Sequence, residues 1–240
     1  MPEGIYAAAA GMAAQQTRMD SLANDVANVN TTGYKHERVG FEDLVYQAVE
    51  QHVQVGAGSA AVDVGRSFSQ GALTQTGEPL SLAIAGPGFF QVKRSDGSTA
   101  LTRSGDFSLD ANGSIVTAHG EHLVPPLTVP KGTDLAQISI SAAGDVTVGA
   151  TKVGTIAIVD VPAVSSLTPV GDNLFAPSTA SGAPSPVNGS TLQQGYLEAS
   201  NVDLASTMTD MIDAQRGYEL ASRAIKTQDQ LLDVANQLVR

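Results

Sequence analysis

The chain has 240 residues, of which 42% are apolar, so it is long enough to bury a hydrophobic core in one or two domains. Its 13 basic and 24 acidic side chains leave a formal charge of -11, which repels phosphate backbones and anionic lipid and argues against a nucleic-acid partner. The absence of cysteine excludes disulfides, cysteine-based zinc sites and thiol catalysis.

The start of the sequence lacks the features of a leader. Residues 1–4 carry no lysine or arginine, and the apolar run of residues 5–14 gives way to Gln15, Gln16 and Arg18. This pattern predicts neither a cleaved signal peptide nor a membrane span. Any export is therefore expected to leave the N-terminus uncleaved.

Residues 3–30 contain no proline and predict a helix, because large apolar side chains recur along them every seven residues. This apolar stripe, with one interleaved member, consists of Ile5, Met12, Met19, Leu22 and Val26. Short polar residues and Gly33 follow, and such residues compete with the helix for backbone hydrogen bonds or allow a left-handed turn. We expect the helix to end near Val29.

The same seven-residue spacing runs through the C-terminal segment and is the most regular pattern in the sequence. Its members are Leu204, Met211, Tyr218, Ile225, Leu232 and Val239. Ser200 followed by Asp203 is similar to a capping box and predicts a helix that begins at 201–203. Gly217 lies inside this helix, where it either costs about 1 kcal/mol or permits a second helix to approach closely. Helices of this length, roughly 57 and 40 Å, need a partner along them.

Between the helices the apolar period changes to two, and Asp-Gly and Asn-Gly pairs supply turns, which predicts β-hairpins. The expected fold is α+β. A discontinuous, coiled-coil-like module of long helices, residues 1–34 and 201–240, encloses an all-β domain rich in hairpins at 76–175. Residues 35–75 and 176–200 are expected to be extended connectors.

Candidate chemical sites are few. His119 and His122 have a spacing that suits a metal only on a helix, and nearby glycine and proline favour a solvated turn. Residues 110–113 are similar to the start of a calcium loop, but the spacing of the later ligands fails, so a hairpin turn is expected. The glycines at 56–58 and 86–88 lack a following phosphate-binding helix. We predict no catalytic, cofactor-binding or metal-binding residue, no small-molecule substrate and no enzymatic activity.

Several stretches together resemble the bacterial flagellar axial proteins, the subunits of the rod and hook. These stretches are residues 27–35 with 41–44, 82–92, 102–107, 110–113, 198–203 and 215–219. The residues that carry the resemblance are Asn28, Thr31, Gly33, Tyr34, Lys35, Gly86, Gly88, Phe89, Phe90, Ser200, Asn201, Val202, Gln215, Arg216 and Tyr218. They follow the order of the family along nearly the whole chain.

The resemblance implies a structural subunit of the flagellar basal body that polymerises into a helical tube and transmits torque to the hook. Its implied partners are further copies of itself, adjacent rod and hook subunits and the flagellar type III export apparatus. The chain length favours a rod position over the hook, with the distal rod preferred and the proximal rod as the alternative. A secreted adhesin-like binding module is the alternative from another class, and a hydrolase has no named residue to support it.

We expect the terminal helices to form the inner wall of such a tube and the β domain to form the outer wall. Before assembly the helical ends lack partners, so we expect them to be largely disordered.

Overall fold

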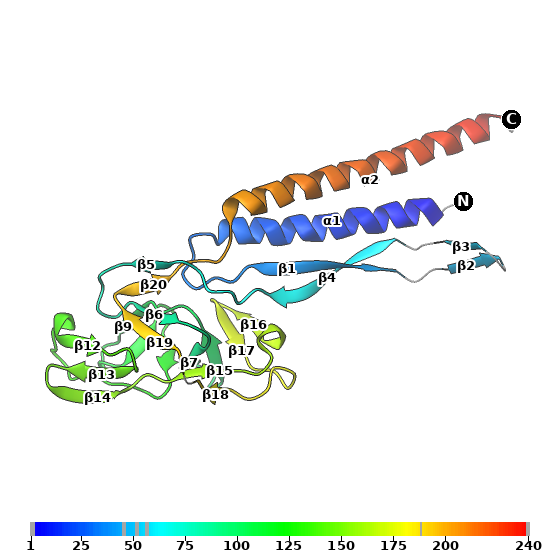
Figure 1. The fold of residues 1–240 in the computed structure, drawn as a ribbon. Coiled ribbons are helices and arrows are strands. Elements are labelled where there is room, and N and C mark those ends of the chain that lie inside the picture. The colour runs from blue at the N-terminus through cyan, green and yellow to red at the C-terminus, as the bar shows by residue number, and fades with distance from the viewer. Residues whose placement is uncertain (1–2, 45–46, 51–52, 56–57, 188, 239–240) are drawn as a thin grey trace. The chain divides into compact units, whose positions relative to one another are not determined.

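The computed structural model describes residues 3–44, 47–50, 53–55, 58–187 and 189–238. The chain forms two compact units, the first from Met1–Ala27, Glu37–Gly65 and Asp203–Arg240, and the second from Asn28–His36 and Arg66–Val202. The first unit contains both long helices, and the second contains most of the strands (Figure 1). This arrangement confirms the predicted α+β class with a discontinuous helical module.

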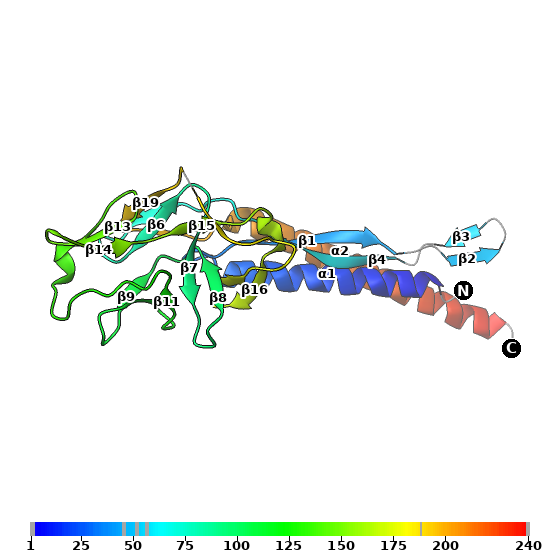
Figure 2. The same ribbon diagram turned by 90° about the horizontal axis from the view of Figure 1, so that it is seen from below.

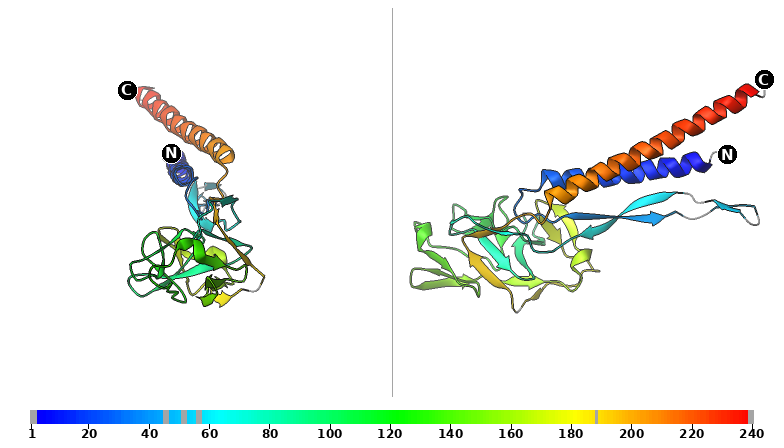
Figure 3. Two further views of the ribbon diagram at one scale, coloured as in Figure 1. Left: turned by 90° about the vertical axis from the view of Figure 1, so that its left-hand side faces the viewer. Right: turned by 45° about the horizontal axis from the view of Figure 1, so that its top comes forward.

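The first unit is built on two helices that pack in opposite directions, α1 (Glu3–Ala27) and α2 (Leu204–Leu238) (Figure 3). Alanine, methionine, glutamine and leucine dominate both segments and favour helix. The predicted capping box at Ser200 is wrong, because Asp203 itself caps α2 and its Oδ1 accepts a hydrogen bond from Ala205 N at 3.0 Å. The Ser200 hydroxyl instead accepts from Val202 N at 3.2 Å, just before the helix.

Two antiparallel ribbons complete the first unit. The strands β1 (Glu37–Asp43) and β4 (Ser59–Arg66) form one ribbon, and β2 (Gln47–Glu50) and β3 (Val53–Val55) form the other (Figure 2). β1 packs along α1. Within the segment expected as an extended connector at 35–75, these strands pair with one another.

The second unit contains a nine-stranded sheet and three smaller sheets. The path of the large sheet is β16-β17-β8-β7-β11-β10-β9, with β15 joined to both β7 and β18. Figure 2 shows β9, β11, β7 and β8 in this order across the sheet. The strands of the large sheet are β7 (Phe89–Lys93), β8 (Thr99–Thr102), β9 (Phe107–Leu109), β10 (Ile115–Thr117), β11 (His122–Leu123), β15 (Ile158–Asp160), β16 (Thr168–Gly171), β17 (Leu174–Ala176) and β18 (Ser185–Pro186).

The smaller sheets pair segments that lie close together or far apart in the sequence. The sheet β12-β13-β14 is a local meander, whereas β19 pairs with β6 and β20 pairs with β5. These strands are β5 (Leu73–Gln75), β6 (Leu82–Ala85), β12 (Ile138–Ile140), β13 (Asp145–Val148), β14 (Thr151–Thr155), β19 (Thr191–Gln194) and β20 (Tyr196–Glu198), and short 3-10 turns lie at Leu135–Gln137 and Val164–Ser166.

Two clusters of buried side chains stabilise the second unit. The larger cluster is mostly aliphatic and includes Phe90, whose ring meets Phe107 edge-on at a centroid distance of 5.1 Å. The smaller cluster gathers Phe89 and Phe175 around the half-buried ring of Phe68, with centroid distances of 5.5 and 5.1 Å to Phe68. Alternation along β7 places Phe89 and Phe90 on opposite faces of the sheet, so each contributes to a different cluster.

The contacts divide the chain differently from the predicted domains at two places. Residues 28–36 cluster with the second unit, although we expected residues 28–34 to belong with the helices. Residues 191–198, expected as a connector, form β19 and β20 within the second unit. Residues 28–33 form turns and residues 191–198 form strands, and the sequence pattern alone does not identify the partner of either segment.

Candidate functional site

The face of α2 that packs against α1 carries small side chains. Ala214 and Thr207 are buried on α2, and Ala14 and Leu22 are buried on α1. A Cβ atom placed on Gly217 would lie 3.1 Å from Gln15 Cδ, so the glycine lets α1 approach closely, the second of the two roles considered for it. We call this contact between α1 and α2 the seam. It is narrow and is not a wide apolar interface.

The predicted stripe residues flank this seam. On α1 all of them are half-buried except Leu22, which is buried. On α2, Met211 and Ile225 are half-buried, whereas Leu204 and Tyr218 are 42% and 38% exposed. The Leu232 side chain and the whole of Val239 lie outside the described part of the chain. The stripe residues Met211, Tyr218 and Ile225 lie within about 60° of Ala214 around the helix, at its edge.

A second apolar face of α2 is not evident from the heptad pattern. It consists of Met208, Ile212, Leu220, Leu231 and Val234, which are 49–65% exposed. At 100° per residue these positions span an arc of about 140° opposite Ala214, which they share with exposed charged residues such as Arg216, Glu219 and Arg223. Apart from Leu135, the large hydrophobic side chains exposed in the described part of the chain belong to the first unit. The residues of this face do not recur every seven positions, so the heptad pattern does not identify them.

The loop after α1 contains the first group of the residues that carry the resemblance to the flagellar axial proteins. We call these the family-like residues. Thr31 Oγ1 donates to Asn28 Oδ1 at 3.1 Å, and Thr31 N donates to Asn28 O at 3.0 Å, which closes a turn. Gly33 has a φ of 69°, and a Cβ atom there would lie 2.6 Å from Ser104 N. Both the left-handed backbone and the close approach require glycine at this position. Gly33 N donates to Glu198 O at 2.8 Å, which joins the loop to β20.

Three ionisable side chains meet in the interior of the second unit next to this loop. Lys35 Nζ lies 2.5 Å from Glu198 Oε1, and Arg103 Nη1 lies 3.2 Å from Glu198 Oε2. The side chains of Lys35 and Glu198 are fully buried, and that of Arg103 is 4% exposed. Lys35 Nζ also donates to Ser69 O at 2.8 Å. We call Lys35, Arg103 and Glu198 the buried triad.

The buried triad contains two cations and one carboxylate. Burial lowers the pKa of Lys35, and the positive charge of Arg103 lowers it further, although the hydrogen bond and charge of Glu198 oppose both effects. Burial also lowers the pKa of Arg103. The Arg103 guanidinium is held by Gly86 O, which accepts from Nη2 at 2.9 Å, and by the Phe89 ring at 5.4 Å. Glu198 is thus the shared counter-ion of two cations from separate chain segments.

Asn201 joins the same chain segments by a second network. Its Oδ1 accepts from His36 N at 2.8 Å, and its Nδ2 donates to Ser67 O at 2.8 Å and to Ser69 Oγ at 2.9 Å. Asn201 N donates to Tyr34 O at 3.4 Å. The amide therefore connects the segment before α2 to the segments on either side of the β1–β4 ribbon in sequence.

Tyr34 and the glycines before β7 lie around these networks. The Arg66 guanidinium lies 5.5 Å from the Tyr34 ring centroid, and its Nη1 donates to Lys35 O at 3.1 Å. Gly86 and Gly88 precede β7, which places Phe89 in the smaller core and Phe90 in the larger one. The family-like residues from both ends of the chain thus converge in the second unit.

The remaining family-like residues do not join this group. Gln215, Arg216 and Tyr218 are on α2, and Val202 is half-buried just before the helix. They lie on or next to the helix whose outer face is apolar.

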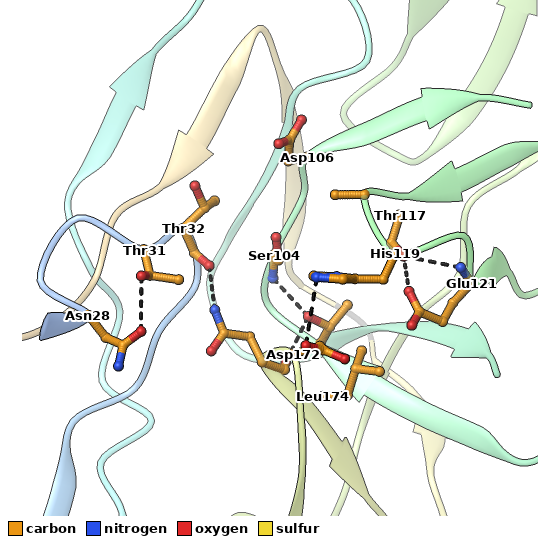
Figure 4. A pocket seen from close by; sticks show the side chains of 13 residues that line it. Asn28, Thr31, Thr32, Ser104, Asp106, Thr117, His119, Glu121, Asp172 and Leu174 are labelled. Atoms are coloured by element: carbon orange, nitrogen blue, oxygen red, sulfur yellow. Dashed lines mark hydrogen bonds and ion pairs between the residues drawn. The ribbon is translucent and has the colours of Figure 1, made fainter. Parts of the chain in front are cut away.

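A polar hollow of about 420 Å³ lies beside the loop after α1 (Figure 4). His119 Nε2 lies 3.6 Å from Asp172 Oδ1, Asn173 Nδ2 donates to Thr32 O at 2.9 Å, and Thr117 Oγ1 contacts Glu121 Oε2. Among the residues that the structure describes, no three histidine, cysteine, aspartate or glutamate side chains are arranged to hold a metal ion. The hydrogen bond from Asn173 to Thr32 joins the loop to the strands of the second unit. Hydroxyl and carboxylate groups line the hollow.

The two turns weighed as metal sites are hairpin turns, as predicted. His119 is exposed in the turn between β10 and β11, and His122 begins β11. Asp110 Oδ1 accepts from Asn112 N at 2.8 Å and Ser114 N at 2.7 Å in the β9–β10 turn. These hydrogen bonds hold the pKa of Asp110 below its usual value.

Three family profiles match the chain in sequence order. Residues 5–35 match the flagella basal body rod protein profile, residues 83–148 match the flagellar hook protein FlgE/F/G D1 domain, and residues 193–238 match the flagellar basal body rod FlgEFG protein C-terminal profile. Paired helical ends with an inserted β unit and these three matches define a structural protein of the flagellar axis.

Relatives cover almost the whole chain. It is 38% identical to the flagellar basal-body rod protein FlgG of Agrobacterium fabrum, with 96% of this chain and 97% of that protein covered. It is 39% identical to FlgG of Caulobacter vibrioides, with 98% and 99% covered, and 33% identical to FlgF of the same organism, with 93% and 92% covered. The chain belongs to the family of flagellar basal-body rod proteins. This family is structural, so the prediction of a non-enzymatic protein is confirmed.

Sequence reasoning missed Glu198 and Arg103 as partners of Lys35. Each lay inside a family-like stretch, at residues 198–203 and 102–107, but neither was singled out. The only signal was that charged residues make up just 15% of this chain, so each one inside a family-like stretch was a candidate for a specific contact. Charged side chains that are fully buried are almost always paired.

Proposed function

We propose that this protein is a structural subunit of the flagellar rod, in its distal part, and that it polymerises with copies of itself and contacts adjacent rod and hook subunits. FlgG is the distal rod protein, and the identity to FlgG of Caulobacter vibrioides exceeds that to FlgF of the same organism. This difference supports the distal position over the proximal one. The match along the full chain disfavours a secreted binding module.

The observation that carries the assembly proposal is the position of the exposed apolar side chains. The strands of the second unit enclose two complete cores, whereas α2 exposes an apolar face opposite its seam with α1. Contiguous exposed apolar surface marks interaction sites in soluble chains. We infer that Met208, Ile212, Leu220, Leu231 and Val234 contact neighbouring subunits, together with the half-buried stripe residues at the edges of the seam.

Delivery to the basal body is proposed to use the flagellar export apparatus without a cleaved signal peptide. Among the residues that the structure describes, neither helix is long and apolar enough to cross a bilayer. An intact N-terminal mass for the subunit in purified basal bodies is the expected result, and a shortened N-terminus would contradict this part of the proposal.

Deletion of the gene tests the function directly. Basal bodies isolated from the deletion strain and viewed by electron microscopy are expected to carry a rod that stops before its distal part and lacks a hook. A complete rod and hook would contradict the assignment.

The assembly face is tested by complementing the deletion with Leu220→Lys, which places a charge on the apolar face. We expect loss of the distal rod with normal expression of the chain. Ala224→Lys is the matched control, because it adds the same charge at an exposed position of α2 outside the arc of this face. Equal loss of rods in both variants would show that added charge, and not the apolar face, is responsible.

A further inference from the structure

The seam between α1 and α2 is poor in the large side chains that set the register of a helix pair. A Cβ atom on Gly217 would lie 3.1 Å from Gln15 Cδ, and one on Gly4 would lie 3.0 Å from Gln228 Oε1. Eleven residues separate the two positions on each helix, so both contacts report one antiparallel register. These two contacts favour the observed register, but the small side chains buried elsewhere in the seam, such as Ala14 and Ala214, discriminate little between it and a register shifted by a turn.

The polar atoms of the seam also leave the register weakly specified. Gln15 Oε1 is buried and accepts no hydrogen bond from the described residues. The Thr207 hydroxyl donates to Asp203 O of its own helix at 2.7 Å, and not to α1. Helix pairs gain a unique register from size-matched knobs or from a polar or charged contact at one position.

Arg18 supplies a charged contact of this kind. Its Nη2 lies 2.8 Å from Asp210 Oδ1 on α2, and its guanidinium lies 6.0 Å from the ring centroid of Phe41 on β1. One side chain of α1 thereby touches the other helix and the adjacent ribbon. The pair is part-exposed, at 29% for Arg18 and 44% for Asp210, so it contributes little to total stability.

We propose that Arg18 is a positioning residue that fixes the register of α1 against α2 through Asp210 and Phe41. A shift by one helical turn of about 5.4 Å would separate Arg18 from Asp210. The register decides which stripe residues of α1 lie beside those of α2 at the edges of the seam, where the proposed function places contacts with neighbouring subunits. The inference thus deepens the proposed assembly function and rests on it.

Engineered cysteine pairs measure the register without background, because the chain has no native cysteine. Gln15→Cys with Gly217→Cys reports the observed register, and Gln15→Cys with Ala221→Cys reports a register shifted by about one turn. Each pair is placed in the full chain, incorporated into rods in cells, and oxidised in purified basal bodies. Crosslinks within one chain are separated from those between chains by gel mobility and identified by mass spectrometry.

In the native background the first pair is expected to crosslink in preference to the second. Arg18→Met is expected to lower the ratio of the two yields by about three- to tenfold, since it removes both the ion pair and the contact with Phe41. Arg223→Met is the matched control, because Arg223 pairs with Glu219 on its own helix and its loss should leave the ratio unchanged. An unchanged ratio in Arg18→Met rods would overturn the proposal.

A charge swap resolves the case in which Arg18→Met chains do not enter rods. The double variant Arg18→Asp with Asp210→Arg restores an ion pair in the same register and is expected to recover incorporation and the first crosslink. A double variant no better than Arg18→Met would also overturn the proposal. Absence of the unmodified chain from basal bodies would instead refute the proposed function, which keeps the two failures distinct.

Discussion

Glu198 Oε1 lies 2.5 Å from Lys35 Nζ inside the second unit, although 163 positions separate the two residues in sequence. Glu198 also accepts from Gly71 N at 2.9 Å and pairs with Arg103, so one carboxylate holds the segment after α1, the segment after β4 and the β8–β9 loop. The chain passes between the two units after Ala27, His36, Gly65 and Val202. Lys35 and Glu198 are therefore close in sequence to two of these boundaries.

Glu198→Gln should destabilise the second unit strongly. It leaves Lys35 and Arg103 buried without their counter-ion, and breaking a buried pair in this way costs about 3–5 kcal/mol. Urea unfolding of the full chain followed by circular dichroism measures the loss. Glu219→Gln is the control, because Glu219 lies on the exposed surface of α2 and its change should stay within about 0.5 kcal/mol.

Lys35→Met should cost less than Glu198→Gln. Methionine keeps an apolar chain of similar length in the buried site, and Glu198 retains Arg103 as its partner. The same unfolding measurement ranks the two variants. A loss for Lys35→Met equal to or greater than that for Glu198→Gln would show that Glu198 is not the centre of the triad.

The pH dependence of stability should report the lowered pKa of Lys35. Because burial lowers this pKa in the folded chain, the unfolded chain binds more protons between the folded value and the ordinary value of 10.5. The free energy of unfolding contributed by Lys35 therefore rises with pH through that window. Unfolding measured from about pH 7 to the ordinary lysine pKa should give a more positive slope for the native chain than for Lys35→Met. Equal slopes would refute the assigned shift.

Asn201→Ala should weaken the second unit by about 1–3 kcal/mol, because His36 N and Ser67 O lose their side-chain partner. Asn201→Asp tests the geometry more finely, since it keeps the acceptor for His36 N but removes the donor to Ser67 O. We expect Asn201→Asp to be destabilised as well. Unfolding of both variants beside the native chain checks this prediction, and a neutral Asn201→Asp would indicate that only the acceptor contributes.

Ala214→Leu should separate α1 from α2. Ala214 is fully buried in the seam, and added methylenes in a packed site cost about 1–3 kcal/mol. Ala224→Leu makes the same substitution at an exposed position of α2 and should be nearly neutral. Reduced crosslinking of the Gln15→Cys and Gly217→Cys pair in the Ala214→Leu background measures the separation. Equal effects of the two leucine substitutions would contradict the seam described for this helix pair.

The local elements were largely predictable because their causes are local. Helix-forming residues without proline define α1 and α2, the short polar residues after Ala27 end the first helix, and Asp203 lies at the predicted start of the second. Asp-Gly and Asn-Gly pairs predicted the hairpins for the same reason, since turn chemistry depends on a few adjacent residues. The family-like stretches likewise indicated the protein family, because their order along the chain is a property of the sequence.

The two helical ends were therefore determined by the sequence itself, whereas their packing was decided by the tertiary structure. Periodicity shows that α2 has apolar positions, but Ala214 and Thr207 are buried beside α1 while Tyr218 is exposed, because close packing selects the small side chains. The sequence alone likewise does not identify the partner of Lys35. A buried charge must be paired, but which distant carboxylate pairs with it depends on how the strands bring Glu198 to the loop after α1.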